Sequence, residues 1–325
     1  MVHYGAMDAN RPREGGPVRP PRGWSVYWLA TRPAFLTASA APVLVGSCAA
    51  LASGAAFHWP LFLLALVGIM ALHAGANAVN DYCDHLSGND WVNTNPTPFS
   101  GGRRFIQQGL LTPRATLATG LAFLGVGAAA GLVILAMTRS LFILGIGLAG
   151  ILGALFYTAK PVQLAYRGIG EVVIALLFGL LPVYGSYMLQ TRRIDAVPLG
   201  PALIVSALIF LVIFVNEFPD RRADAQVGRR TLVVRLGVPR CARLYRLALV
   251  CTYAVATGML VQQATSWAGV LYLLTVPLAV PAWRAANTRA LEAPGQWRAN
   301  QLTIVLHTVG SLALALGLTL RWAWA

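Results

Sequence analysis

Charged side chains are scarce in this chain of 325 residues. They make up 11% of the sequence, whereas a soluble domain usually carries about 25%. Hydrophobic residues make up 57%, and the mean hydropathy is +0.63. So few charges argue against a soluble protein, because most of the surface would then be apolar. The composition instead indicates a membrane protein with several spanning helices.

Cysteine is also rare. The four cysteines, at positions 48, 83, 241 and 251, form no C-x-x-C or Cys/His pattern. Most of them fall in apolar runs, where a free cysteine packs as a small hydrophobic side chain. The sequence therefore predicts neither a zinc site nor a disulfide framework.

Long apolar runs, in contrast, recur along most of the chain. A spanning helix needs about 20 mostly apolar residues, and nine segments satisfy this requirement. We predict an all-α protein in which residues 1–23 form a disordered, basic cytoplasmic tail and residues 24–325 form one transmembrane domain. The nine predicted spans are 33–54, 60–84, 114–136, 140–158, 168–190, 197–219, 243–263, 266–284 and 301–321.

Basic residues gather on one side of this predicted topology. Of the 25 lysines and arginines, 21 fall in the tail and in loops on the same side as the tail. Because positive charges collect in cytoplasmic loops, we expect the N-terminus in the cytoplasm and the C-terminus outside. The net charge of +14 is then explained by anionic lipid headgroups and an anionic substrate. We expect no nucleic acid as a partner.

Acidic residues are fewer still, and their distribution is uneven. The chain has eleven, and six of them lie in two short segments. The first is NDYCDHLSGND, from Asn80 to Asp90, and the second is NEFPDRRAD, from Asn216 to Asp224. Each lies at the predicted cytoplasmic end of an apolar helix, where ionisable groups are candidates for a functional site. The alternative is that these acids only cap helix ends.

Polar residues recur at every fourth position in both segments, which puts them on one face of a helix. Two such faces brought together would form a site made of oxygen ligands. Such a site suits Mg²⁺, which takes one or two carboxylates and completes its shell with water and phosphate oxygens. The residues with this spacing are Asn77 with Asp81, Asn80 with Asp84, and Asn216 with Asp220 and Asp224.

Cations in the predicted cytoplasmic loops could contact a bound phosphate. Lys160 is the single lysine of the chain and lies close to Tyr157 in YTAKP; a compact charge there suits a diphosphate oxygen. Arg103 and Arg104 follow a Ser-Gly-Gly sequence, and Arg221, Arg222, Arg229 and Arg230 lie in or just after the second acidic segment. The alternative for the arginines is that they serve only to orient the protein in the membrane.

Taken together, these features predict a diphosphate held through Mg²⁺ by two acidic helices, with its hydrocarbon part in the bilayer. A polyprenyl diphosphate has both parts. Metal and cations would stabilise the leaving diphosphate. An aromatic ring would be a natural nucleophile for the allylic fragment that remains.

At these residues the chain resembles the UbiA superfamily of intramembrane prenyltransferases, over about residues 24–322. The resemblance implies nine helices, an active site on the cytoplasmic side, and transfer of a prenyl chain from its diphosphate with Mg²⁺. The general first motif is NDxxDxxxD, but here Gly88 replaces the last aspartate and Asp90 follows. This variant, together with NxxxDxxxDxxxGxxTLxVRLG from Asn216, is similar to the branch that prenylates 1,4-dihydroxy-2-naphthoate on the way to menaquinone.

The resemblance also implies roles for particular residues. Lys160 and one of Arg103 and Arg104 would contact the diphosphate, and Asp90 would either bind metal or face the aromatic acceptor. The chain would be an integral protein of a bacterial-type inner membrane. The residues implied as metal ligands are Asn80, Asp84, Asp90, Asp220 and Asp224, and the last four of these, with Lys160, are the implied catalytic residues.

Two departures from that branch leave the acceptor open. Glu217 stands where the branch often has asparagine, and the loop NTNPTPFSGGRR differs as well. Another phenolic or lipid acceptor is one alternative, and internal quenching of the carbocation, as in membrane terpene cyclases, is a second. A transporter is a third, although the acids lie at one membrane face rather than at the bilayer midplane.

Overall fold

The computed structural model describes residues 23–293 and 297–323, and these residues contain helices and loops but no strand. The predicted tail, residues 1–23, lies almost wholly outside this described part. The elements are α1 (Trp24–Ala30), η1 (Pro33–Phe35), α2 (Thr37–Ala52), α3 (Trp59–Ser87), α4 (Asn89–Val92), α5 (Pro113–Thr138), α6 (Leu141–Phe156), η2 (Leu164–Tyr166), α7 (Gly170–Ala175), η3 (Leu176–Leu180), α8 (Leu181–Thr191), α9 (Leu199–Gln226), α10 (Leu232–Leu236), α11 (Val238–Met259), α12 (Ser266–Leu273), α13 (Val276–Ala285), α14 (Thr288–Glu292) and α15 (Arg298–Ala323).

The long apolar helices identify an integral membrane protein. Five helical stretches are long and apolar enough to span a membrane: α3, α5, α7 to α8, α9 and α15. Two bent pairs, α1 to α2 and α12 to α13, raise the number to as many as seven in the described part of the chain. All nine predicted spans coincide with helices, but α6 has 16 residues and the first turns of α11 carry three arginines. The all-α class is confirmed, whereas nine spans stay a prediction.

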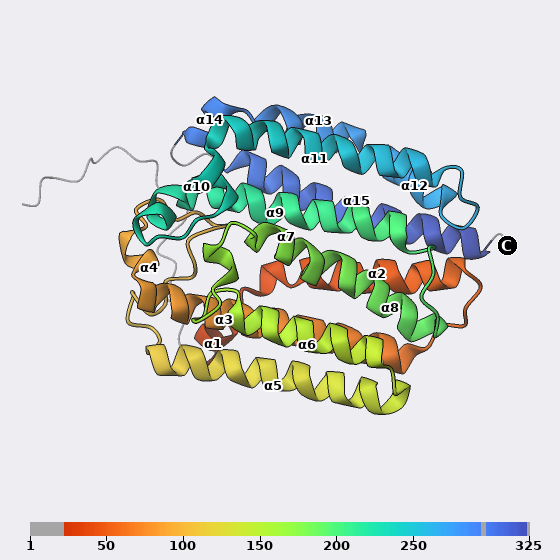
Figure 1. Ribbon diagram of the computed structural model, residues 1–325, viewed down its shortest axis with the longest axis horizontal. Coiled ribbons are helices and arrows are strands. Elements are labelled where there is room, and N and C mark those ends of the chain that lie inside the picture. The colour runs from red at the N-terminus through yellow and green to blue at the C-terminus, as the bar shows by residue number, and fades with distance from the viewer. Residues whose placement is uncertain (1–22, 294–296, 324–325) are drawn as a thin grey trace, which may run out of the picture.

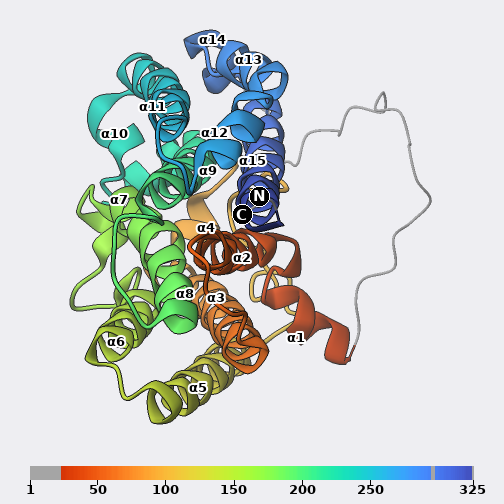
Figure 2. The same cartoon turned by 90° about the vertical axis from the view of Figure 1, so that its right-hand side faces the viewer.

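The helices lie side by side in a bundle whose long axes run roughly in one direction (Figures 1 and 2). The largest buried cluster is centred on α9, whose Leu208, Leu211 and Phe214 have no exposed surface. Helices α2, α11 and α15 contribute to this cluster. At one end of the bundle, α4 and α10 lie beside the C-terminal ends of α3 and α9 (Figure 1). The two acidic segments, far apart in sequence, therefore meet at that end.

Glycines allow α3 and α5 to pack closely. A Cβ atom at Gly120 of α5 would lie 2.8 Å from Val79 Cγ2 and 3.1 Å from the Gly75 carbonyl oxygen of α3. At Gly75 it would lie 2.7 Å from Leu124 Cγ. Small residues at such contacts let two membrane helices approach until their backbones touch. The position of α3, and with it the first acidic segment, depends on this contact.

Replacing Gly120 with alanine is expected to destabilise the protein by about 1–3 kcal/mol, because the added methyl group meets backbone that cannot move aside. Gly125 on the same helix is the matched control, since a Cβ atom there meets nothing within 4 Å. Gly125→Ala should be neutral or stabilising by up to about 1 kcal/mol, the helix preference of alanine over glycine. Thermal unfolding of the two variants in detergent measures the difference. Equal stability would contradict the importance of this contact.

Candidate active site

A glycine turn places the end of the first acidic segment. Helix α3 ends at Ser87, and Gly88 has φ +84°, a conformation that aspartate rarely adopts. The chain then starts the short helix α4 at Asn89, and Asp90 is buried with 3% of its surface exposed. An acid at position 88 would be strained, whereas an acid two residues later faces the site. This is a physical reason for the Gly88 and Asp90 variant.

A cavity of about 230 Å³ lies between the two acidic segments. One end of it is polar and carries Asp84, Asp90, Asp220 and Asp224. The remaining walls are largely apolar. Their side chains include Ile69, Leu72, Leu177, Phe178, Ile209 and Ile213. The cavity thus offers a charged compartment joined to a hydrocarbon-like one.

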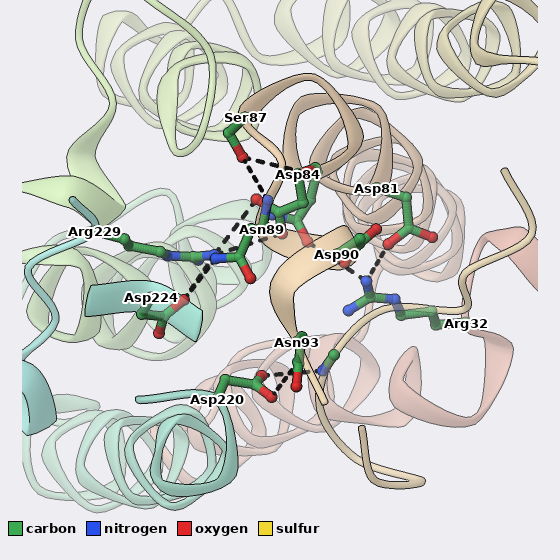
Figure 3. A network of polar contacts seen from close by, with 12 residues as sticks. Arg32, Asp81, Asp84, Ser87, Asn89, Asp90, Asn93, Asp220, Asp224 and Arg229 are labelled. Carbon is green, nitrogen blue, oxygen red and sulfur yellow. Dashed lines mark hydrogen bonds and ion pairs between the residues drawn. The ribbon is translucent and has the colours of Figure 1, made fainter. Parts of the chain in front are cut away.

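Arg229 links the two acidic segments across the polar end (Figure 3). Its Nη1 lies 3.4 Å from Asp84 Oδ2 and 3.8 Å from Asp224 Oδ1. Burial acts to lower the pKa of Arg229, but these carboxylates raise it well above the ordinary value of arginine. Asn89 Nδ2 donates to Asp224 Oδ1 at 2.7 Å. The first and second motifs are therefore joined by an arginine and an amide.

Asp220 is held by the loop that follows α4. Asn93 Nδ2 donates to Asp220 Oδ1 at 2.8 Å (Figure 3). The Gly101 N–H donates to Asp220 Oδ2 at 3.0 Å. Gly101 has φ +76°, which presents its N–H to the carboxylate. The NTNPTPFSGGRR loop therefore forms one wall of the site.

Asp81 differs from the other acids of the first segment. It forms an ion pair with Arg32, which precedes η1 (Figure 3). Arg32 itself lines the cavity, whereas Asp81 is buried behind it. Asp81 therefore positions an arginine rather than facing the cavity directly.

Asp90 lies where negative charge accumulates. Burial, followed by the charges of Asp84 and Asp81, raises its pKa to about 7, and Arg32 and Arg104 act in the opposite direction. The Gln107 side chain donates to Asp90 Oδ2 at 3.1 Å. Since each additional carboxylate makes the others harder to ionise, a divalent cation here would relieve the repulsion.

The donor set at the polar end fits Mg²⁺. Among the described residues, no three His, Cys, Asp or Glu side chains come close enough to form a metal site by themselves. That is expected for Mg²⁺, which binds one or two carboxylates and takes its remaining ligands from water and phosphate. The buried carboxylates and amides facing one cavity supply such oxygens, and thiolates and imidazoles play no part in the polar end.

Residues 39–305 match the UbiA prenyltransferase family. The chain belongs to this family. It is therefore a prenyltransferase enzyme, and the resemblance inferred from the two motifs is confirmed.

The chain is also similar to individual members of this family. The chain is 35% identical over 262 residues to the 1,4-dihydroxy-2-naphthoate octaprenyltransferase of Mycobacterium leprae, covering 80% of this chain and 85% of the relative. It is 36% identical over 256 residues to the protein of the same name from Mycobacterium tuberculosis, covering 78% and 84%. A solved UbiA homolog from Archaeoglobus fulgidus bound to GPP and Mg²⁺ has a TM-score of 0.60 at 16% identity, covering 90% of this chain and 97% of that one. This last likeness concerns the fold.

Most of the residues predicted for this prenyltransferase line the cavity. Lys160 and Arg222 are exposed and lie outside its lining, and Arg104 donates to the Asp90 carbonyl oxygen at 2.8 Å. Their contacts with diphosphate, and that of Arg103, stay predictions. The predicted residues that line the cavity are Asn77, Asn80, Asp84, Asp90, Tyr157, Asn216, Asp220 and Asp224.

Sequence reasoning did not single out three polar residues of the site. The sequence indicates Arg32 only as one of the tail charges. It indicates Arg229 only as one of four arginines in or just after the second acidic segment, and Asn89 only as a member of the first segment. Asn89 could have been found, because it adjoins Asp90 in the first motif. Arg229 follows Gly228, which has φ +75° and ends the turn after α9. That turn is what directs Arg229, rather than Arg222, into the site.

Proposed function

We propose that this UbiA-family enzyme transfers a polyprenyl chain from its diphosphate to an aromatic acceptor in a Mg²⁺-dependent reaction. The acceptor proposed is 1,4-dihydroxy-2-naphthoate, with loss of CO₂, which is a step of menaquinone synthesis. The observation that carries this proposal is a cavity that has four aspartates at one end and largely apolar walls along the rest. The two mycobacterial relatives support the choice of acceptor.

The cavity suggests how the two parts of the donor substrate are held. We place the diphosphate at the polar end and the prenyl chain along Leu72, Leu177 and Ile213. Apolar walls exclude water there, which protects an allylic electrophile from hydrolysis. The guanidinium of Arg229 can also pair with phosphate oxygens, for which the fork of an arginine side chain is well suited. The proposed metal-holding residues are Asn80, Asp84, Asp90, Asp220 and Asp224.

Mg²⁺, when bound, would neutralise diphosphate charge and orient the leaving group. The donor set of this chain supports that role, as does the Archaeoglobus fulgidus homolog bound to GPP and Mg²⁺. We further propose nine spans within residues 24–325, the N-terminus in the cytoplasm, and the active site at the cytoplasmic face of a bacterial-type inner membrane. The positive-inside distribution of arginines supports this orientation.

A product assay tests the proposed function. Purified protein is incubated with several polyprenyl diphosphates, each with 1,4-dihydroxy-2-naphthoate, with another phenol, or with no acceptor, and products are identified by mass spectrometry. We expect a prenylated, decarboxylated naphthalenediol together with diphosphate. A cyclised hydrocarbon formed without acceptor would favour a terpene cyclase. Substrate flux in proteoliposomes without turnover would favour a transporter.

A further inference from the structure

Two buried glutamates lie beside the cavity, one inside the second acidic segment and one outside both segments. Glu217 of α9 lines the cavity with 7% of its surface exposed, and Glu171 of α7 is 1% exposed. Their carboxyl groups interact directly with each other. The contact between them is a side-chain hydrogen bond, and the buried Oε2 atom of each carboxyl has no other hydrogen-bond partner among the described residues. We call these two residues the Glu171–Glu217 pair.

Glu217 lies on α9 between the polar end of the cavity and its apolar wall. Ile213, Glu217, Asp220 and Asp224 all line the cavity, and their spacing of three and four residues places them on one helix face. Glu217 lies about 4.5 Å of helix rise beyond Asp220, on the side toward the apolar wall. A group next to Glu217 therefore stands where the polar end meets the apolar part.

The neighbours of the pair show what holds it in place. Glu171 Oε1 accepts the Leu232 N–H at 2.5 Å, at the start of α10. The other charged groups acting on Glu217 are Arg229 and Asp224. Tyr157 also lines the cavity, and it interacts electrostatically with both glutamates. Glu171 is thus held by backbone and by Glu217, while Glu217 itself lines the cavity.

Two carboxyl groups buried side by side are costly, because neither offsets the desolvation of the other. Stability therefore does not account for these side chains. A ligand O–H group in the cavity could donate to the Glu217 carboxyl while its flat apolar ring rests against the apolar wall. A ligand carboxylate would be repelled by the pair, so an acceptor that carries one, such as 1,4-dihydroxy-2-naphthoate, would turn a hydroxyl group rather than its carboxylate toward Glu217.

We propose that Glu217, positioned by Glu171, binds a hydroxyl group of the aromatic acceptor and orients the ring toward the allylic end of the prenyl diphosphate. The inference deepens the proposed function and rests on it for the identity of the acceptor. The hydroxyl donates to the carboxyl group of Glu217 from the cavity side. Glu171 is a positioning residue that acts through Glu217.

The test compares affinity for the two substrates in the full-length protein. Equilibrium binding of 1,4-dihydroxy-2-naphthoate and of a polyprenyl diphosphate is measured separately, alongside KM for each. We expect Glu217→Ala to raise the Kd and KM of the naphthoate about tenfold, a loss of about 1.4 kcal/mol. The values for the diphosphate should stay within about twofold. Glu217→Gln, which preserves the shape of the side chain, should show the same selectivity with a smaller effect.

Substrate analogues and a second variant sharpen the result. A naphthoate lacking one hydroxyl should bind more weakly than the parent to the wild type, and this difference should disappear in Glu217→Ala. Glu171→Gln should weaken naphthoate binding by less, and the Glu171→Gln, Glu217→Gln double variant should be no worse than Glu217→Gln alone. Glu292→Gln, an exposed acid on α14, is the control and should match the wild type.

Other outcomes overturn the inference. Equal weakening of both substrates, weakening of the diphosphate alone, or unchanged naphthoate binding in Glu217→Gln would each do so. An undiminished preference for the hydroxylated analogue in Glu217→Ala would do so as well. Failure of the proposed function would look different. The wild-type protein would then form no prenylated product, although it would still bind the naphthoate at Glu217.

Discussion

Replacing Asp84 with alanine is expected to reduce prenyl transfer about a thousandfold, in the range found when a group that stabilises developing charge is removed. Asp84 faces the cavity from α3 and lies 3.4 Å from Arg229 Nη1. The variant removes a carboxylate from the polar end and leaves Arg229 with Asp224 as its remaining ion-pair partner. Turnover of a polyprenyl diphosphate, followed by release of diphosphate, measures the loss.

Three comparisons show whether the charge of Asp84 is responsible. Asp84→Asn preserves the shape of the side chain and should be nearly as inactive as Asp84→Ala. Asp195→Asn is the matched control, because Asp195 is exposed, lies outside the cavity and contacts Tyr187. EDTA should abolish wild-type turnover, and added Mg²⁺ should restore it. Product formation that survives either EDTA or Asp84→Ala would disprove the metal-dependent mechanism.

The helices could be predicted from the sequence because each depends on local composition. A run of about 20 apolar residues has few alternatives to a helix in a membrane, so all nine predicted segments coincide with helices. Whether each of these helices crosses the membrane is harder to predict from composition. The chain bends between α12 and α13, where Pro277 follows the first residue of α13, and α6 has 16 residues, so an apolar run of the right composition need not form one straight span.

The acidic motifs could also be predicted, because residues four apart share a helix face whatever the rest of the fold does. Asp220 and Asp224 line the cavity as this spacing predicts. The partners of these acids could not be predicted in the same way. Arg32 and Arg229 reach the site through backbone turns, Arg32 with φ +54° in its own residue and Arg229 after the positive φ of Gly228.

Lys160 and Arg229 show why the cation of the site could not be predicted from the sequence. Lys160 stands out in the sequence as the single lysine, yet its side chain is exposed outside the cavity lining. Arg229 is one of many arginines, yet it lies between two aspartates. Rarity of a residue type indicates selection of some kind, but only the path of the chain decides which cation meets the acids.

Arg229→Gln is expected to lower the free energy of unfolding by about 3 kcal/mol when no metal is added, at the lower end of the range for breaking a buried ion pair. The reason is that Asp84 and Asp224, whose side chains are 12% and 4% exposed, would lose the cation between them. The same substitution should reduce turnover about a hundredfold, since a cation near the diphosphate is lost as well. Thermal unfolding in detergent and the turnover assay give the two values.

The adjacent arginine provides the control for this prediction. Arg230 is exposed, so Arg230→Gln should change stability by less than about 0.5 kcal/mol, as surface substitutions usually do. Added Mg²⁺ should recover part of the stability of Arg229→Gln, because a divalent cation also relieves repulsion among the aspartates. Turnover should stay low, because the guanidinium that pairs with phosphate oxygens is still missing. If Arg229→Gln and Arg230→Gln behave alike in both assays, Arg229 does not join the two motifs in the way its position indicates.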